Sequence, residues 1–181
     1  TVLELWHSRT LKALLVFSLL SPLAALTLAS LFLVDIGKVY MDGVAGISQM
    51  LAMVYLLFLV ITLLSRDIYQ RVCYILLTPP VNRRDYLIGR LLGVTFIFLI
   101  ILATLFVSGA LAGWVVISEK TVFFRSGYEW SNLAVMLFFH FFQYISIIGF
   151  IFFIVSWSSG EPESMLFTVA LLVFSWVFPP V

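Results

Sequence analysis

The side chains best suited to chemistry lie near one another late in the sequence. His140, Gln143 and Tyr144 occupy positions i, i+3 and i+4, so they share one face of a helix. They interrupt the phenylalanine-rich stretch 138–142, and polar groups inside an apolar helix usually point into the protein. This face could line a substrate path, hydrogen-bond a neighbouring helix or, through His140, hold a metal or haem. A two-histidine ligand set is disfavoured because the other histidine, His7, is far off in the sequence.

Gln49 and Tyr55, in an earlier apolar segment, carry the same alternatives. The candidate pathway-lining residues are therefore Gln49, Tyr55, His140, Gln143 and Tyr144. No Gly-x-x-x-x-Gly-Lys run is present, so any ATP chemistry must belong to a partner. Cys73 is the single cysteine, which excludes an intrachain disulfide and a cysteine-based metal cluster. We expect no catalytic residues and no metal site.

The composition places the chain in a membrane. Apolar residues make up 63% of it and charged residues 10%, whereas soluble domains carry roughly 25% charge. The apolar runs are about 20 residues long, which suits helices and is twice the length that a barrel strand needs. The sequence predicts an all-α, polytopic transmembrane helix bundle. The net charge of +1 gives no support for nucleic-acid binding.

We expect one transmembrane domain, residues 1–181, with five membrane spans. A short interfacial helix precedes the spans, with Trp6 in the headgroup layer, and a cytoplasmic segment separates spans two and three. By residue number, the interfacial helix is 1–12, the spans are 13–34, 46–65, 86–117, 131–157 and 163–179, and the cytoplasmic segment is 66–85. Residues 35–43 are expected to turn, and Pro22 is expected to kink the first span. The third helix should begin near Arg83 and tilt or project from the membrane because it exceeds one span.

Basic residues predict a cytoplasmic N-terminus. In that orientation seven of them lie inside and three outside. The inner set is Arg9, Lys12, Arg66, Arg71, Arg83, Arg84 and Arg90, and the outer set is Lys38, Lys120 and Arg125. Five spans would leave the C-terminus outside, so we expect the chain to be a fragment that lacks a sixth helix.

The cytoplasmic segment has the pattern of a short amphipathic helix. Its apolar residues fall at i, i+4, i+7 and i+8, namely Ile68, Val72, Ile75 and Leu76. Thr78, Pro79 and Pro80 should end this helix. From the residues alone, the segment is either a surface turn whose arginines bind lipid phosphate or a docking element for a partner.

The run 76–92 resembles the cytoplasmic signature of ABC-2 type transporter permeases. It reads Leu-Leu-Thr-Pro-Pro-Val-Asn-Arg-Arg-Asp-Tyr-Leu-Ile-Gly-Arg-Leu-Leu. In that family a leucine-rich amphipathic helix leads to Thr/Ser-Pro-Val/Leu-Ser-Arg and then to Leu-x-x-Gly-Lys at the start of the third helix. The order of surface helix, spans and cytoplasmic segment is also similar to the family, in which six spans are expected.

The resemblance implies a partner that hydrolyses ATP. In the family this segment docks onto a cytoplasmic ATP-binding subunit, which would hold ATP and Mg, while this chain would hold no cofactor and would not be an enzyme. The docking residues would be Asp67, Tyr69, Gln70, Arg71, Tyr74, Arg83 and Arg84. Residues 69–72 depart from the family's Glu-x-Gly-Thr, and Tyr74 replaces a common glutamate.

Four glycines of the third helix form two small-x-x-x-small pairs, which favour close helix packing. The pairs are Gly89 with Gly93 and Gly109 with Gly113. By resemblance, we expect a dimerising permease, an exporter of the bacterial or archaeal cytoplasmic membrane, with a second copy of the permease and the lipid bilayer as further partners. The alternative is a non-transporting subunit that anchors or assembles a larger membrane complex.

Overall fold

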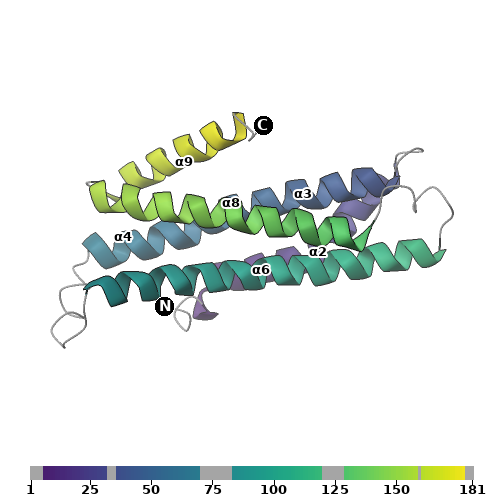
Figure 1. Cartoon of the computed structure of the whole chain (residues 1–181), viewed down its shortest axis with the longest axis horizontal. Coiled ribbons are helices and arrows are strands. Elements are labelled where there is room, and N and C mark those ends of the chain that lie inside the picture. The colour runs from purple at the N-terminus through teal and green to yellow at the C-terminus, as the bar shows by residue number, and fades with distance from the viewer. Residues whose placement is uncertain (1–5, 32–35, 70–82, 120–128, 159, 178–181) are drawn as a thin grey trace.

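The computed structural model describes residues 6–31, 36–69, 83–119, 129–158 and 160–177. All regular secondary structure in these ranges is helical, which confirms the predicted all-α fold (Figure 1). The elements are α2 (Arg9–Ala29), α3 (Ile36–Tyr55), the π-helical η1 (Leu56–Ile61), α4 (Thr62–Tyr69), α6 (Arg83–Glu119), α8 (Trp130–Trp157) and α9 (Glu161–Val177). Helices α3, η1 and α4 follow one another without interruption, so the described residues form five helical rods.

Within the described residues, four stretches are long and apolar enough to cross a membrane. They are Arg9–Ala29, Ile36–Arg66, Asp85–Trp114 and Trp130–Trp157, with 21, 31, 30 and 28 residues. A hydrocarbon core about 30 Å thick needs about 20 helical residues, so each stretch suffices. Helix α9 has 17 residues, or about 25 Å at 1.5 Å per residue, and is shorter than such a core.

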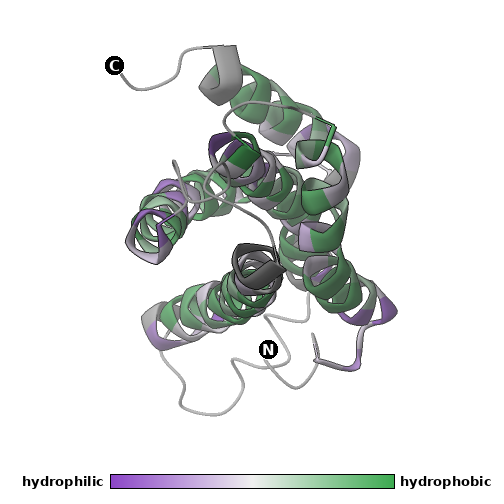
Figure 2. Ribbon diagram, turned by 90° about the vertical axis from the view of Figure 1, so that its right-hand side faces the viewer, coloured by the Kyte–Doolittle hydropathy of each residue, from purple (hydrophilic) through white to green (hydrophobic). Residues whose placement is uncertain are grey.

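Apolar side chains cover the outside of the bundle as well as its interior. Leu28, Phe139 and Phe153 are 58%, 67% and 64% exposed although each belongs to one of these long helices. Figure 2 shows hydrophobic residues on the outer sides of the helices as well as between them. Water would not tolerate such a surface on a monomer, whereas lipid does. The chain is therefore a polytopic transmembrane helix bundle.

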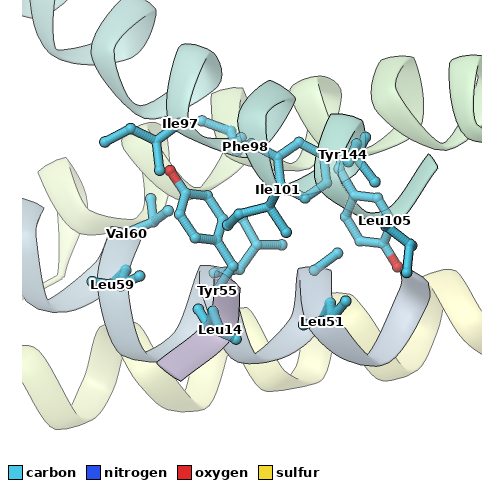
Figure 3. Packing of buried hydrophobic residues seen from close by; sticks show 14 of the residues in the cluster. Leu14, Leu51, Tyr55, Leu59, Val60, Ile97, Phe98, Ile101, Leu105 and Tyr144 are labelled. Carbon is cyan, nitrogen blue, oxygen red and sulfur yellow. The ribbon is translucent and has the colours of Figure 1, made fainter. Parts of the chain in front are cut away.

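The core lies where α2, α3, α6 and α8 meet. Helix α2 packs most extensively against α6 and α3, and α6 also packs against α8. Phe98 of α6 is fully buried near the middle of this core, beside Tyr55 and Tyr144 (Figure 3). These contacts join residues that are far apart in the sequence, and they hold the spans in one body.

The start of the first span differs from the expected boundary. Helix α2 begins at Arg9, and Ser8 caps it by accepting a hydrogen bond from the Leu11 amide at 3.1 Å. A serine cap satisfies one of the free amides of a helix start. Leu11 is 1% exposed, so it belongs to the core and not to a surface helix over residues 1–12.

The first helix also ends earlier than the expected residue 34. It ends at Ala29, where the hydroxyls of Thr27 and Ser30 donate to the carbonyls of Ala24 and Thr27 at 2.8 and 2.7 Å. Hydropathy alone does not determine where a helix ends, which is why the span was expected to be longer.

The second helix begins at Ile36, ten residues before the expected boundary at 46. Glycines and charges in residues 35–43 suggested a turn, but Lys38 and Asp42 are exposed on the helix surface. Gly43 lies against α2, and a Cβ placed there would be 3.4 Å from the Cβ of Ala25. The glycine therefore serves close helix packing here and not a turn.

The remaining boundaries differ by a few residues, apart from the cytoplasmic segment. Helix α6 contains the whole expected span 86–117. Helix α8 begins one residue before the expected span 131–157 and ends with it, and α9 begins two residues before the expected span 163–179. The expected segment 66–85 is helical at both ends, since α4 continues to Tyr69 and α6 begins at Arg83. Residues 70–82 lie outside the described residues.

Candidate functional site

A seam of hydroxyl groups lies between α2 and α6, around Pro22. Proline has no amide hydrogen, so the carbonyl four residues earlier, that of Ser18, loses its helical donor. The Ser108 hydroxyl of α6 donates to this carbonyl at 3.1 Å, and the Ser21 hydroxyl lies 3.4 Å from it. Ser108 also lies 3.2 Å from the carbonyl of Leu105 in its own helix, so Ser18 is the nearer acceptor. The neighbouring span thus compensates for the proline.

A second contact in the same seam joins side chains directly. The hydroxyls of Ser18 and Thr104 are 2.8 Å apart, and one donates to the other. Ser18 is fully buried, so this bond is screened from lipid. Interhelical hydrogen bonds of this kind stabilise membrane bundles by about 0.6 to 2 kcal/mol each. The sequence analysis missed the seam, although the spacing of Ser18, Ser21 and Pro22 against Thr104 and Ser108 was a usable signal.

Two tyrosines of α3 fasten that helix to the backbone of α6. Tyr40 donates to the carbonyl of Gly109 at 2.7 Å, and Tyr55 donates to the carbonyl of Val94 at 2.6 Å. Both side chains are fully buried. A buried phenol needs a hydrogen-bond partner, and a carbonyl oxygen can accept a second bond beside its helical one. These bonds set the register of α3 against α6.

Two of the expected pathway residues are packed inside the core. Tyr55 stacks on Phe98 with ring centroids 5.5 Å apart, and Tyr144 meets Phe98 edge to face at 5.6 Å. Tyr144 is 5% exposed. Figure 3 shows both tyrosines among apolar side chains of α3 and α6. Within this chain, Tyr55 and Tyr144 hold helices together.

His140 forms a hydrogen bond between helices. Its Nδ1 lies 2.7 Å from the hydroxyl of Ser48 in α3, which is buried. The Ser48 hydroxyl also donates to the carbonyl of Ala45 at 2.7 Å. A hydroxyl has one proton, so with that proton directed to Ala45 the His140 Nδ1 is the donor and Nε2 remains an acceptor. Among the described residues, no group of three metal-ligating side chains gathers around this histidine.

Gln143 lies apart from these contacts, in a groove between α8 and α9. The groove has a volume of about 580 Å³ and a mostly apolar lining. Its lining is Phe139, Phe142, Gln143, Ser146, Ile147, Phe150, Leu171 and Phe174. Figure 1 shows α9 inclined away from α8 toward its C-terminal end, which opens the groove. Gln49, the remaining expected pathway residue, is half-buried on α3.

The glycines of α6 have different surroundings. A Cβ at Gly109 would lie 3.6 Å from the Tyr40 hydroxyl and 3.8 Å from Leu133 Cδ2, so this glycine lies where α3 and α8 approach. Gly93 and Gly113 are buried. Gly89, expected to pack, is exposed, and a Cβ there would meet nothing within 4 Å. Within the described residues it contributes no close helix contact.

The expected docking residues are divided between two helix ends and the undescribed segment. Asp67 and Tyr69 belong to α4, and Arg83 and Arg84 to the start of α6. Gln70, Arg71 and Tyr74 lie outside the described residues.

One basic residue near the start of α6 is buried. Arg90 is 7% exposed and lies with its guanidinium 5.9 Å from the centroid of the Tyr86 ring. This distance fits a cation–π contact. Arg90, which the sequence analysis counts among the cytoplasmic basic residues, is therefore packed against a side chain of its own helix.

Comparison with known proteins assigns no family to the chain. No family model, no curated protein and no solved structure matches it.

Proposed function

We propose that the chain is the membrane-spanning permease subunit of an ATP-driven transporter, with an orientation that leaves the N-terminus in the cytoplasm. ATP and Mg bind a separate cytoplasmic subunit, and a second permease copy completes the translocation path. Transport is outward, across a bacterial or archaeal cytoplasmic membrane. The observation that carries the proposal is the run 76–92, which resembles the partner-docking signature of ABC-2 type permeases.

The length of α6 supports this role. Its 37 residues extend about 55 Å at 1.5 Å per residue, roughly 25 Å more than a hydrocarbon core. The segment 66–85 connects this long helix to the rod formed by α3, η1 and α4. A helix that projects from the membrane can carry a displacement of the docking segment to the core residues around Phe98.

The π-helical η1 supports a hinge in the preceding rod. Six residues, Leu56–Ile61, have the wider π geometry, which is frequently found at functional sites. Tyr55, immediately before η1, is bonded to the carbonyl of Val94. The α3 part of the rod is thereby held on α6, while α4, beyond η1, connects to the docking segment.

Reconstitution with the ATPase that co-purifies with the chain tests the proposal. The measurement is ATP hydrolysis in liposomes with and without the permease, for the wild type and for Arg71→Ala and Tyr74→Ala. We expect the permease to change the ATPase rate, and each substitution to weaken docking by about 2 kcal/mol, the size of an interface hot spot, or roughly thirtyfold.

Lys38→Ala is the matched control, because Lys38 is an exposed basic residue on α3, at the other end of that rod from the docking segment. It should leave the ATPase rate unchanged. Equal coupling in all variants would contradict the docking role. Failure of any nucleotide-hydrolysing protein to co-purify would contradict the proposal as a whole.

One observation favours a second candidate function, a membrane anchor or assembly subunit. Tyr55 and Tyr144 are buried in packed core, so they line no path within a single copy. An anchor needs no such path. Substrate-dependent stimulation of ATP hydrolysis would separate the candidates, because a permease predicts it and an anchor does not.

A further inference from the structure

Gln143 is placed at the middle of its membrane span. It lies thirteen residues after Trp130 and fourteen before Trp157, and these tryptophans bound α8. Trp130 and Trp157 are exposed, as expected for side chains in the two headgroup layers. At 1.5 Å per residue the amide is about 20 Å from either end. Gln143 therefore lies near the bilayer midplane.

The amide of Gln143 has no hydrogen-bond partner among the described residues. Ser146 in the same groove does have one, since its hydroxyl donates to the carbonyl of Phe142 at 3.1 Å. A primary amide offers two donors and an acceptor. Leaving them unsatisfied in hydrocarbon costs free energy, so this site calls for a polar partner from outside the described chain.

Lipid alone does not meet this need. Acyl chains fill an apolar groove, but they carry neither donors nor acceptors at the midplane. The eight lining residues of the groove are apolar except for Gln143 and Ser146, and Ser146 is bonded to its own helix. The occupant must therefore combine an apolar surface with one hydrogen-bonding group at the depth of Gln143.

We propose that the α8–α9 groove is the contact surface for a second copy of this chain, with the two Gln143 amides hydrogen-bonded to each other. Two copies inserted in the same orientation carry this residue at the same depth. A two-fold axis along the membrane normal then brings identical surfaces together. A primary amide is both a hydrogen-bond donor and an acceptor, so two Gln143 side chains at the same depth can bond to each other.

The aromatic rim of the groove gives this contact its area. Phe139, Phe142 and Phe150 of α8 are 67%, 52% and 59% exposed, and Phe174 of α9 is 65% exposed. They flank Gln143 on one face of the helix pair. Packing and interhelical hydrogen bonds drive association in lipid, where the hydrophobic effect contributes little. The face supplies both.

Cysteine cross-linking tests the contact. In a Cys73→Ser background, Gln143→Cys is oxidised in membranes, and we expect a covalent dimer. Leu19→Cys is the control because Leu19 is 56% exposed at the middle of α2, a helix with no extensive contact to α8. It should remain monomeric. A monomeric Gln143→Cys, or equal cross-linking of both variants, overturns the proposal.

A second measurement isolates the amide. Dimerisation of fluorophore-labelled protein in liposomes is followed by energy transfer as the protein is diluted in lipid. Gln143→Leu keeps the bulk and removes the hydrogen bonds, so association should weaken about threefold to thirtyfold. Gln143→Asn, which keeps an amide, and Ser146→Ala, whose hydroxyl is already bonded locally, should both still dimerise. Unchanged association of Gln143→Leu would overturn the proposal.

The proposed function includes a second copy of the chain, and this inference assigns the surface that the second copy contacts. It rests on the proposed function for the identity of the molecule in the groove. Its failure can be distinguished, because neither measurement involves ATP. A chain that dimerises through Gln143 but stimulates no ATPase would uphold the contact and contradict the transporter. A chain that couples to an ATPase with Gln143→Leu fully dimeric would do the reverse.

Discussion

The α2–α6 seam and the α8–α9 groove both place polar side chains inside the membrane, but they treat them differently. In the seam, the carbonyl left free by Pro22 receives the Ser108 hydroxyl, and Ser18 is bonded to Thr104. In the groove, the Gln143 amide faces phenylalanine rings with no partner among the described residues. Within the described residues, the polar groups of the seam are hydrogen-bonded and the Gln143 amide of the groove is not.

This difference distinguishes polar groups that stabilise the fold from polar groups that are available to bind another molecule. A polar side chain in hydrocarbon must be satisfied by something, and the identity of that partner decides its role. Where the partner is the next helix of the same chain, the group stabilises the fold. Where the described residues provide none, as at Gln143, the group is a candidate for contact with another molecule.

The largest effect should come from comparing two phenylalanines, one in the packed core of the chain and one in the groove. Phe98→Ala removes a fully buried ring that contacts Tyr55 and Tyr144 and should cost about 3–5 kcal/mol of stability. Phe142→Ala removes a half-exposed ring of the groove and should cost much less in a monomer. Unfolding by SDS in mixed micelles measures both. Equal losses would contradict the distinction between the regions.

A smaller effect should reveal the proline seam. Ser108→Ala removes the donor to the Ser18 carbonyl and should cost about 1 kcal/mol. In a Pro22→Ala background the helix regains its own amide donor, so the same Ser108→Ala change should cost clearly less. The coupling is read from a double-mutant cycle of SDS unfolding. Strictly additive losses would mean that Ser108 does not serve the proline carbonyl.

The smallest effect should be that of Gln143 on the monomer. At high dilution in detergent, Gln143→Leu should change stability by no more than about 0.5 kcal/mol, because no bond within the described chain is lost. Ser48→Ala is a useful contrast, since it removes the partner of His140 and should destabilise the monomer. A large loss for Gln143→Leu would show that its amide has a structural partner.

The sequence analysis was accurate about helices and less accurate about their ends. Hydropathy predicted the long apolar spans because the bilayer sets a minimum length for each. It placed the start of the second helix at residue 46 because Gly37 and Gly43 resemble turn residues, whereas Gly43 packs against Ala25. It missed that Leu11 belongs to the core, since the burial of a residue depends on helices that lie beside it.

The candidate site shows the same division. The stripe of His140, Gln143 and Tyr144 was visible in the sequence, but its three members have three different environments. His140 is bonded to Ser48, Tyr144 packs on Phe98, and Gln143 opens into the groove. One face of a helix is wide enough to contact two neighbouring helices and the lipid. Helical periodicity in the sequence therefore could not predict which of the three side chains contacts which surroundings.

By itself, the sequence determined that this is an all-helical membrane protein, where its apolar spans lie and that Gln143 sits midway along one of them. These properties depend on composition and on distance along one helix, which a linear chain already contains. Only the tertiary structure decided which polar groups are satisfied, because a hydrogen bond such as Ser108 to Ser18 joins residues ninety positions apart. Their meeting depends on the packing angle and register of whole helices, to which every side chain in the interface contributes.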